Sequence, residues 1–168
     1  MKRRVCISFF VAASCLTGSL AAGQSLGRTS FADRATGLRL FLPPRWVSQA
    51  RSALPGLIGA FRHPLGGRLI ISAQPRTQED TPRYLAMQQA KLLGRRGWTV
   101  PPWTPSRLGP VEAVLVEALD PAKKQKVFQI YALHDKHTLV ITLQAPASQS
   151  AQALTDLRFI AKTARFIR

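Results

Sequence analysis

The chain has 168 residues, of which 46% are hydrophobic and 19% are charged. This length suits one domain with a sizeable core, and the apolar content excludes wholesale disorder. The formal net charge of +16, from 24 basic and eight acidic residues, excludes an acidic solvating tail and leaves anionic partners open.

Residues 1–22 have the three-part pattern of a secretory signal peptide. Basic residues at positions 2–4 precede an apolar run over 5–13, and residues 19–22 are mostly small, as a signal peptidase requires. The run is too short to cross a hydrocarbon core of ~30 Å as a helix. We therefore expect cleavage near Ala22, a periplasmic or secreted protein, and no transmembrane span after signal removal. Loss of the three basic residues lowers the charge from +16 to +13.

Two other export routes stay open. Residues 12–15, Ala-Ala-Ser-Cys, resemble a bacterial lipobox, in which Cys15 would be acylated to give a membrane-anchored lipoprotein, although Ala stands where that box usually has Leu. The Arg pair at 3–4 resembles a twin-arginine signal, although Cys6 stands where that motif prefers Phe. Cleavage near Ala22 removes both cysteines, so the product would have no disulfide, thiolate nucleophile or Cys-ligated metal.

After a short tether over residues 23–29, residues 30–168 show neither an internal repeat nor a linker between two cores. Alternating apolar residues and turn signals predict the elements of a single domain. In chain order these are strands 31–33, 38–42, 57–61 and 69–73, a helix from Thr81 to about Arg96, strands 111–118, 126–133 and 138–143, and a helix from about Gln149 to Phe166. We interpret the Pro-rich stretch 101–105 as a connection between the first helix and the next strand.

Local signals support these boundaries. Pro43 and Pro44 cannot donate backbone hydrogen bonds and end the second strand. Pro82 suits the first position of a helix, and Gly97 can end that helix. The final helix has the clearest periodicity, with apolar residues at 153, 154, 157, 160, 161 and 164. Antiparallel hairpins and two helices predict the α+β class, with a twisted, mostly antiparallel sheet covered by helices.

Several stretches resemble the PsbP/DcrB-like family. Residues 37–46, Gly-Leu-Arg-Leu-Phe-Leu-Pro-Pro-Arg-Trp, are similar to its opening hairpin, and residues 108–113 are similar to its Leu-Gly-Gly-x-x-Ala motif, with Pro110 in place of the second Gly. The closing Leu-Val-Ile-Thr-Leu strand, Pro146 and final helix also match.

The resemblance covers roughly residues 30–168 and rests on structural motifs, so no catalytic set carries over. The family includes extrinsic subunits of photosystem II, a nuclear Ran-binding protein and bacterial envelope lipoproteins. The resemblance implies an α/β/α sandwich and a docking role, although fold similarity alone does not fix function.

No catalytic residue or cofactor is predicted. The sequence has no nucleophile elbow, Walker loop or dinucleotide fingerprint. Asp135, between His134 and His137, gives the one metal-like cluster, but a zinc or copper site needs further ligands. We therefore favour a polar hairpin turn there and keep a metal enzyme or unrecognised hydrolase as a remote alternative.

The remaining candidates are basic and aromatic residues. The basic candidates for an anion or partner surface are Lys123, Lys124 and Lys126 in one hairpin loop, and Arg158, Lys162 and Arg165 on one face of the final helix. Solvated faces are the alternative for these residues. Trp98 and Trp103 suggest either a recognition cleft or a cover for one end of the sheet.

The favoured interpretation is an exported, non-enzymatic envelope protein that docks onto a protein partner or assembly. The alternative is direct binding of anionic lipid, lipopolysaccharide or another polyanion through the basic excess. No specific nucleic-acid partner is expected, because no aromatic-basic motif such as an RNP box occurs.

Overall fold

The computed structural model describes residues 29–50 and 54–167, so the signal-peptide pattern and Cys15 lie outside the described residues. The strands are β1 (Thr29–Ala32), β2 (Leu38–Leu42), β3 (Val47–Ser48), β4 (Leu57–Arg62), β5 (Arg68–Pro75), β6 (Thr104–Leu108), β7 (Val111–Asp120), β8 (Gln125–His134), β9 (His137–Pro146) and β10 (Arg165–Phe166). The helices are α1 (Pro82–Arg95) and α2 (Ser150–Thr163), and a short 3-10 turn, η1 (Ala147–Gln149), precedes α2.

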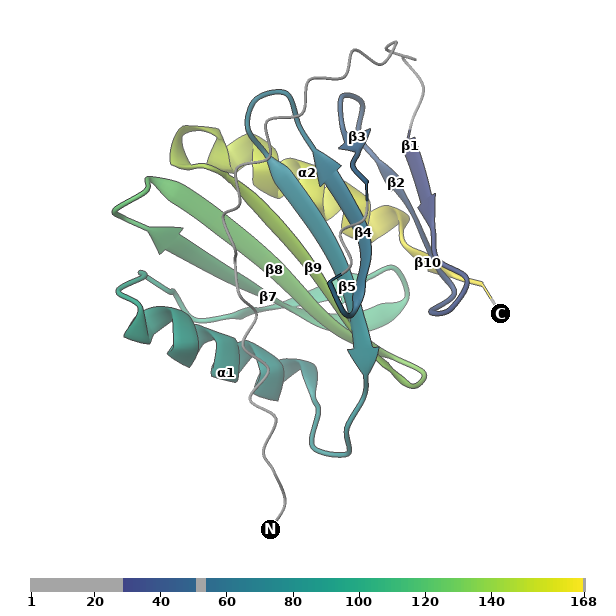
Figure 1. Cartoon of the computed structure of the whole chain (residues 1–168). Coiled ribbons are helices and arrows are strands. Elements are labelled where there is room, and N and C mark those ends of the chain that lie inside the picture. Colours follow the sequence, from purple (N-terminus) through teal and green to yellow (C-terminus); the bar gives the residue numbers. More distant parts are fainter. Residues whose placement is uncertain (1–28, 51–53, 168) are drawn as a thin grey trace.

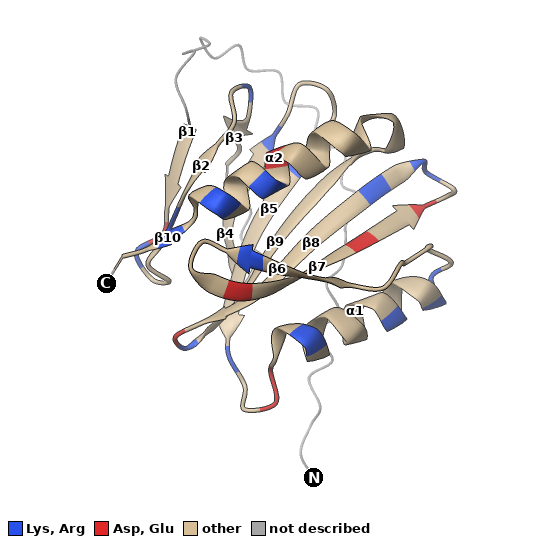
Figure 2. Cartoon of the chain, turned by 180° about the vertical axis from the view of Figure 1, so that it is seen from behind, with Lys and Arg blue, Asp and Glu red and all other residues tan. Residues whose placement is uncertain are grey.

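The strands form two antiparallel sheets. The larger has seven strands in the order β3-β4-β5-β9-β8-β7-β6, and the smaller has three in the order β1-β2-β10. Helix α1 contacts β7 and β8 on one face of the large sheet, whereas α2 and the small sheet cover the other face (Figures 1 and 2). This arrangement confirms the predicted α+β class and the sheet covered by helices.

Side-chain alternation along the strands builds a separate core on each face. On β9, Leu139, Ile141 and Leu143 belong to the core beneath α2, whereas the intervening Val140 belongs to the smaller core beneath α1. Trp46 is buried in the core beneath α2. The last two residues of the predicted helical stripe, Ala161 and Ala164, are also buried.

The predicted start of the first helix is confirmed in detail. The Thr81 hydroxyl accepts a hydrogen bond from the Tyr84 backbone N–H at 3.0 Å, and Pro82 occupies the first helical position. Gly97, just after the helix, has a φ of 80°. Glycine adopts this left-handed conformation without the steric cost of a Cβ, which suits it to end the helix.

The predicted final helix is too long by three residues. It ends at Thr163, whose hydroxyl donates to the Phe41 carbonyl at 3.1 Å and accepts from the Phe41 N–H at 3.2 Å. The chain then extends as β10, where Phe166 pairs with Leu38. Arg165 therefore lies in a strand, because pairing with β2 outweighs helical periodicity at this end.

The sequence also misses two strands of the large sheet. The predicted connection at 101–105 is wrong from Thr104 onward, because β6 pairs along β7. Pro105 is tolerated there because β6 is an edge strand. The two-residue β3 lies at the opposite edge, and β1 begins at Thr29, the last residue of the predicted tether. None of the helices in the described residues is long and apolar enough to span a membrane.

Candidate anion- or partner-binding site

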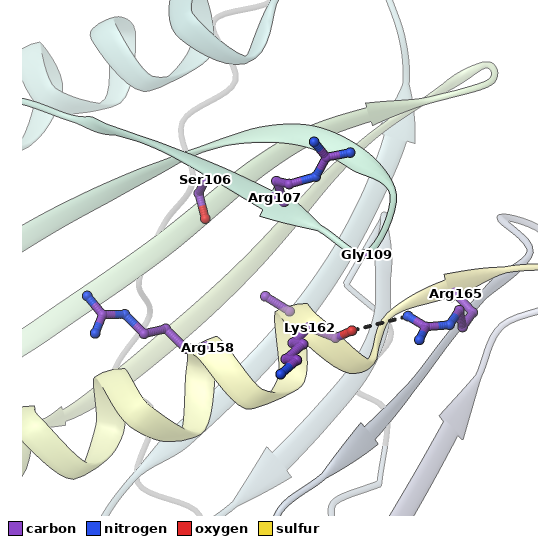
Figure 3. Close-up of a pocket in the computed structure, with 7 residues that line it drawn as sticks. Ser106, Arg107, Gly109, Arg158, Lys162 and Arg165 are labelled. Atoms are coloured by element: carbon purple, nitrogen blue, oxygen red, sulfur yellow. Dashed lines mark hydrogen bonds between the residues drawn. The ribbon is translucent and has the colours of Figure 1, made fainter.

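A basic hollow lies between the second half of α2 and the turn that joins β6 to β7. Its volume is about 270 Å³. It is lined by Ser106, Arg107, Gly109, Arg158, Ala161, Lys162 and Arg165 (Figure 3). All three basic residues predicted on the final helix therefore border one hollow, although Arg165 reaches it from β10.

The backbone of the hollow is held by a close contact at Gly109. The Gly109 N–H donates to the Ala161 carbonyl at 2.8 Å, near the C-terminus of α2. Gly109 has a φ of 58°, and a Cβ there would approach the Ala164 carbonyl oxygen to 2.2 Å. Only glycine fits this position, so the Leu-Gly-Pro sequence at 108–110 fixes the turn against the helix.

The cationic groups around the hollow differ in their partners. The Arg165 guanidinium donates to the Lys162 and Ala164 carbonyls at 3.1 and 2.8 Å, so it supplies hydrogen bonds to carbonyls at the C-terminal end of α2. The Arg107 guanidinium points away from α2 and donates to the Pro110 carbonyl at 2.6 Å (Figure 3).

The two basic residues of α2 itself are both exposed, and they lie four residues apart on one helix face. Among the described residues, neither Arg158 nor Lys162 has a hydrogen bond or ion pair from its side chain. They are the cations of the hollow most available to an anionic group.

The second predicted basic cluster is divided by the structure. Lys123 and Lys124 are exposed in the β7–β8 turn and line another hollow of about 580 Å³ with Pro121. Lys126 lies on β8, where it pairs with Glu117 at 3.0 Å. Grouping the three lysines in one loop was therefore wrong for Lys126, whose charge is already partnered.

The two candidate tryptophans are both half-buried and lie between the end of α1 and β6. Trp103 packs against the core beneath α1, and the Arg83 guanidinium lies 5.7 Å from its ring centroid. Trp98 is half-buried just after α1, and its backbone N–H donates to the Leu93 carbonyl at 3.1 Å. Trp103 thus helps to cover the core beneath α1.

The histidine cluster forms a hairpin turn. His134 ends β8 and pairs with His137, the first residue of β9, and Asp135 between them has a φ of 50°. The His134 ring stacks on Phe166 with centroids 3.8 Å apart. Within the two described segments, no group of three or more His, Cys, Asp or Glu side chains is placed to hold a metal ion.

Comparison with known proteins rests on structure, because neither a family profile nor a curated protein matches the sequence. Cyanobacterial PsbP (CyanoP) from Synechocystis sp. PCC 6803 superposes with a TM-score of 0.67, at 10% identity, over 90% of this chain and 99% of that chain. The chain has a PsbP-like fold.

Other solved structures agree. LpqN, involved in cell envelope biogenesis of Mycobacterium tuberculosis, gives a TM-score of 0.62 at 14% identity, covering 84% of this chain and 91% of that one. A Bacteroides thetaiotaomicron protein gives 0.56 at 13% identity, covering 86% of this chain and 50% of that one. At these identities the likeness concerns the fold.

The PsbP-like motif ending in Trp46 has a packing role that the sequence did not reveal. The Trp46 Nε1–H donates to Asp156 Oδ2 at 2.9 Å, and the Gln152 amide donates to Asp156 Oδ1 at 2.8 Å. Asp156 is buried on α2, so these two donors satisfy its carboxylate in place of water. An acidic residue beside Leu157 in the apolar stripe was the available signal.

Proposed function

We propose that this protein is an exported, non-enzymatic accessory module of the cell envelope whose PsbP-like domain docks onto an acidic surface of a protein partner or assembly. The secretory pattern of residues 1–22 supports export, and the fold shared with the envelope protein LpqN supports the location. A lipoprotein anchored through Cys15 is the alternative form.

The observation that carries the docking role is the hollow beside α2. Arg158 and Lys162 project from a rigid helix, and Gly109 fixes the opposite wall against that helix. Placing charged groups on a rigid element reduces the conformational entropy lost on binding. A carboxylate projecting from a partner would meet both cations, and such pairing favours association between oppositely charged surfaces.

The non-enzymatic assignment rests on how the polar side chains are used. The Asp156 carboxylate bonds Trp46 and Gln152, and the His134 ring stacks on Phe166. The contacts of Asp156 and His134 within the domain are structural and explain where these two side chains lie. The PsbP-like resemblance likewise brings no catalytic set.

Charge reversal tests the docking role. A tagged protein carrying R158E and K162E should recover its partner from detergent-solubilised envelope extract at least about tenfold less than wild type, because two attractive contacts become repulsive. The matched control carries K123E and K124E, which make the same charge change in the β7–β8 turn. The amount of partner recovered by wild type should reach a plateau as extract is added and should fall as the salt concentration rises. The control variant should recover as much partner as wild type. Equal loss in both variants, or no loss in either, contradicts the proposal.

A second candidate is direct binding of lipopolysaccharide or another polyanion through the same cations. The concentration of Arg158, Lys162 and Arg165 around one hollow supports it, because phosphate groups favour clustered basic residues. Saturable, salt-sensitive binding of purified lipopolysaccharide, lost in the R158E/K162E variant, would replace the protein partner with this ligand.

A further inference from the structure

The turns of the domain gather at two ends that differ in charge. The Thr29 end consists of the turns at 43–46, 63–67 and 121–124, the start of β1 and the start of α2. The Gly109 end consists of the turns at 33–37, 109–110 and 135–136, the loop at 76–81 and β10. The basic hollow beside α2 borders the Gly109 end, so the Thr29 end is a different surface.

Contacts join the turns of the Thr29 end into one surface. The Thr29 hydroxyl donates to the Trp46 carbonyl at 3.2 Å, and the Trp46 ring centroid lies 5.3 Å from that of His63 in the β4–β5 turn. Gly66 in that turn lies against Pro146 at the end of β9. The start of β1, the β2–β3 turn, the β4–β5 turn and the end of β9 therefore lie side by side, as the ribbon also shows (Figure 1).

Five cations belong to this end. The Ala147 N–H donates to the Lys124 carbonyl at 2.8 Å, which ties the β7–β8 turn to the start of α2. The exposed or half-exposed cations are Arg45, Arg62, Arg68, Lys123 and Lys124. The N-terminus of α2 adds the positive end of its helix dipole, and no acidic residue lies in its first turn.

The acidic residues do not offset these cations. All eight belong to the described residues, and five lie toward the Gly109 end: Asp33, Glu79, Asp80, Glu112 and Asp135. Of the other three, Asp156 is buried against Trp46, and Glu117 pairs with Lys126. The Asp120 carboxylate is buried and accepts the backbone N–H groups of Ala122 and Lys123 at 3.1 and 3.2 Å.

Apolar side chains are exposed among the same cations. Val47 in β3 and Leu65 in the β4–β5 turn are 54% and 52% exposed, and Pro44 and Pro64 beside them are also exposed. A surface that combines basic and apolar side chains suits the interface of an anionic bilayer, where cations meet headgroups and apolar groups enter the acyl boundary.

We propose that the Thr29 end lies against a bilayer containing anionic phospholipid. Charge complementarity supports this occupant, because exposed cations at this end face anionic headgroups. In the lipoprotein form, acylated Cys15 would also bring a lipid to the chain that joins the domain at this end. The inference goes beyond the docking role and does not depend on it. The membrane would hold the Thr29 end while the hollow beside α2 stays open to a partner.

Vesicle flotation at low salt tests the proposal. The probes are phosphatidylcholine vesicles with and without 30% phosphatidylglycerol. Each basic residue near an anionic surface strengthens binding by about fivefold, so K123E/K124E should lower the affinity for the anionic vesicles at least about 20-fold. R158E/K162E, with the same charge change at the hollow, should stay within about threefold of wild type. Equal loss in the two variants, or no preference of wild type for anionic vesicles, overturns the proposal.

A second measurement is independent of how the N-terminus is anchored. In a background with Cys6 and Cys15 changed to Ala, a polarity-sensitive dye is attached at L65C or at R34C, which lies in the turn of the opposite end. Anionic vesicles should shift the emission of the dye at position 65 to the blue and leave that at position 34 unchanged. A shift at position 34 alone, or equal shifts at both, contradicts the orientation.

The same two charge variants separate the two proposals. If K123E/K124E loses vesicle binding but still recovers the partner, the Thr29 end faces the membrane. This conclusion holds whether or not R158E/K162E loses the partner. Immobilised heparin is the probe for a soluble polyanion. If heparin retains wild type but not K123E/K124E, and wild type does not bind anionic vesicles, the ligand of this end is a soluble polyanion and not lipid.

Discussion

On one face of the seven-stranded sheet, α2 and the β1-β2-β10 sheet cover a continuous apolar core; on the other face, α1 covers a much smaller one. The first core includes Phe128, Leu143 and Leu157, whereas the second consists of Ala86, Val114, Val116, Tyr131 and Val140 with a few half-buried neighbours. The comparison indicates that apolar burial on the α2 face contributes most of the stability and that burial beneath α1 contributes less. The proposed docking hollow therefore lies on the better-packed layer.

The α1 face also holds a buried group of polar side chains. The Gln129 amide donates to the Thr142 hydroxyl at 3.2 Å, and the Tyr131 hydroxyl donates to Gln129 Oε1 at 3.1 Å. The hydrogen bonds thus link Tyr131 and Gln129 on β8 with Thr142 on the adjacent β9. We expect substitutions on the α2 face to cost more stability than substitutions on the α1 face.

The largest loss is expected for Trp46→Ala. The substitution opens a cavity beneath α2 and removes a donor from the buried Asp156 carboxylate, so the free energy of unfolding should fall by about 4 kcal/mol. Urea denaturation measures it. Trp46→Phe keeps an aromatic ring but loses the donor and part of the indole volume, and should cost about 2 kcal/mol. If both variants cost under 1 kcal/mol, the α2 face is not the dominant core.

Gly109→Ala should lower the free energy of unfolding by about 3 kcal/mol. The added Cβ would meet the Ala164 carbonyl oxygen, and the residue would be strained at positive φ. Gly94→Ala is the matched control, because a Cβ there meets nothing within 4 Å and the residue lies in α1. It should raise the free energy of unfolding by about 0.5–1 kcal/mol. Equal effects would mean that the turn does not dock on α2.

Val116→Ala probes the smaller core. Val116 is buried beneath α1, and loss of two methyl groups with partial collapse of the space should cost about 2 kcal/mol. Thermal unfolding followed by circular dichroism gives the change in stability. A cost as large as that of Trp46→Ala would remove the proposed difference between the two faces.

Tyr131→Phe should have the smallest effect at neutral pH, about 1 kcal/mol, because it removes one neutral hydrogen bond to Gln129. The pH dependence is more diagnostic. Burial raises the pKa of Tyr131 above its ordinary value of 10, so the folded state keeps a proton that the unfolded state releases. Stability should therefore decline above pH 10 in wild type, and less steeply in Tyr131→Phe. Parallel declines would contradict the burial of this hydroxyl.

Much of the fold follows from local signals. The Thr81 start of α1 and the stripe containing Leu157 and Ile160 depend on nearby residues, and these predictions are confirmed. Two errors arose where distant segments decide. Helix α2 stops at Thr163 because β2 binds the following residues, and β6 forms because β7 offers an edge.

The candidate site was predicted only in part. Helical spacing placed Arg158 and Lys162 on one face, but it did not place Arg107 and Gly109 opposite them. That wall depends on tertiary docking of the β6–β7 turn. The pairing of Lys126 with Glu117 was equally invisible, because the two residues meet only when β7 and β8 come together.

Site-specific photo-crosslinking in intact envelopes tests the docking claim most directly. A photoreactive residue replaces Ser106, which lines the hollow, or Met87, which is exposed on α1. The account predicts one adduct of defined mass from position 106, lost when R158E and K162E are added, and none from position 87. Adducts from position 87 alone, or equally from both positions, would contradict docking through the α2 face.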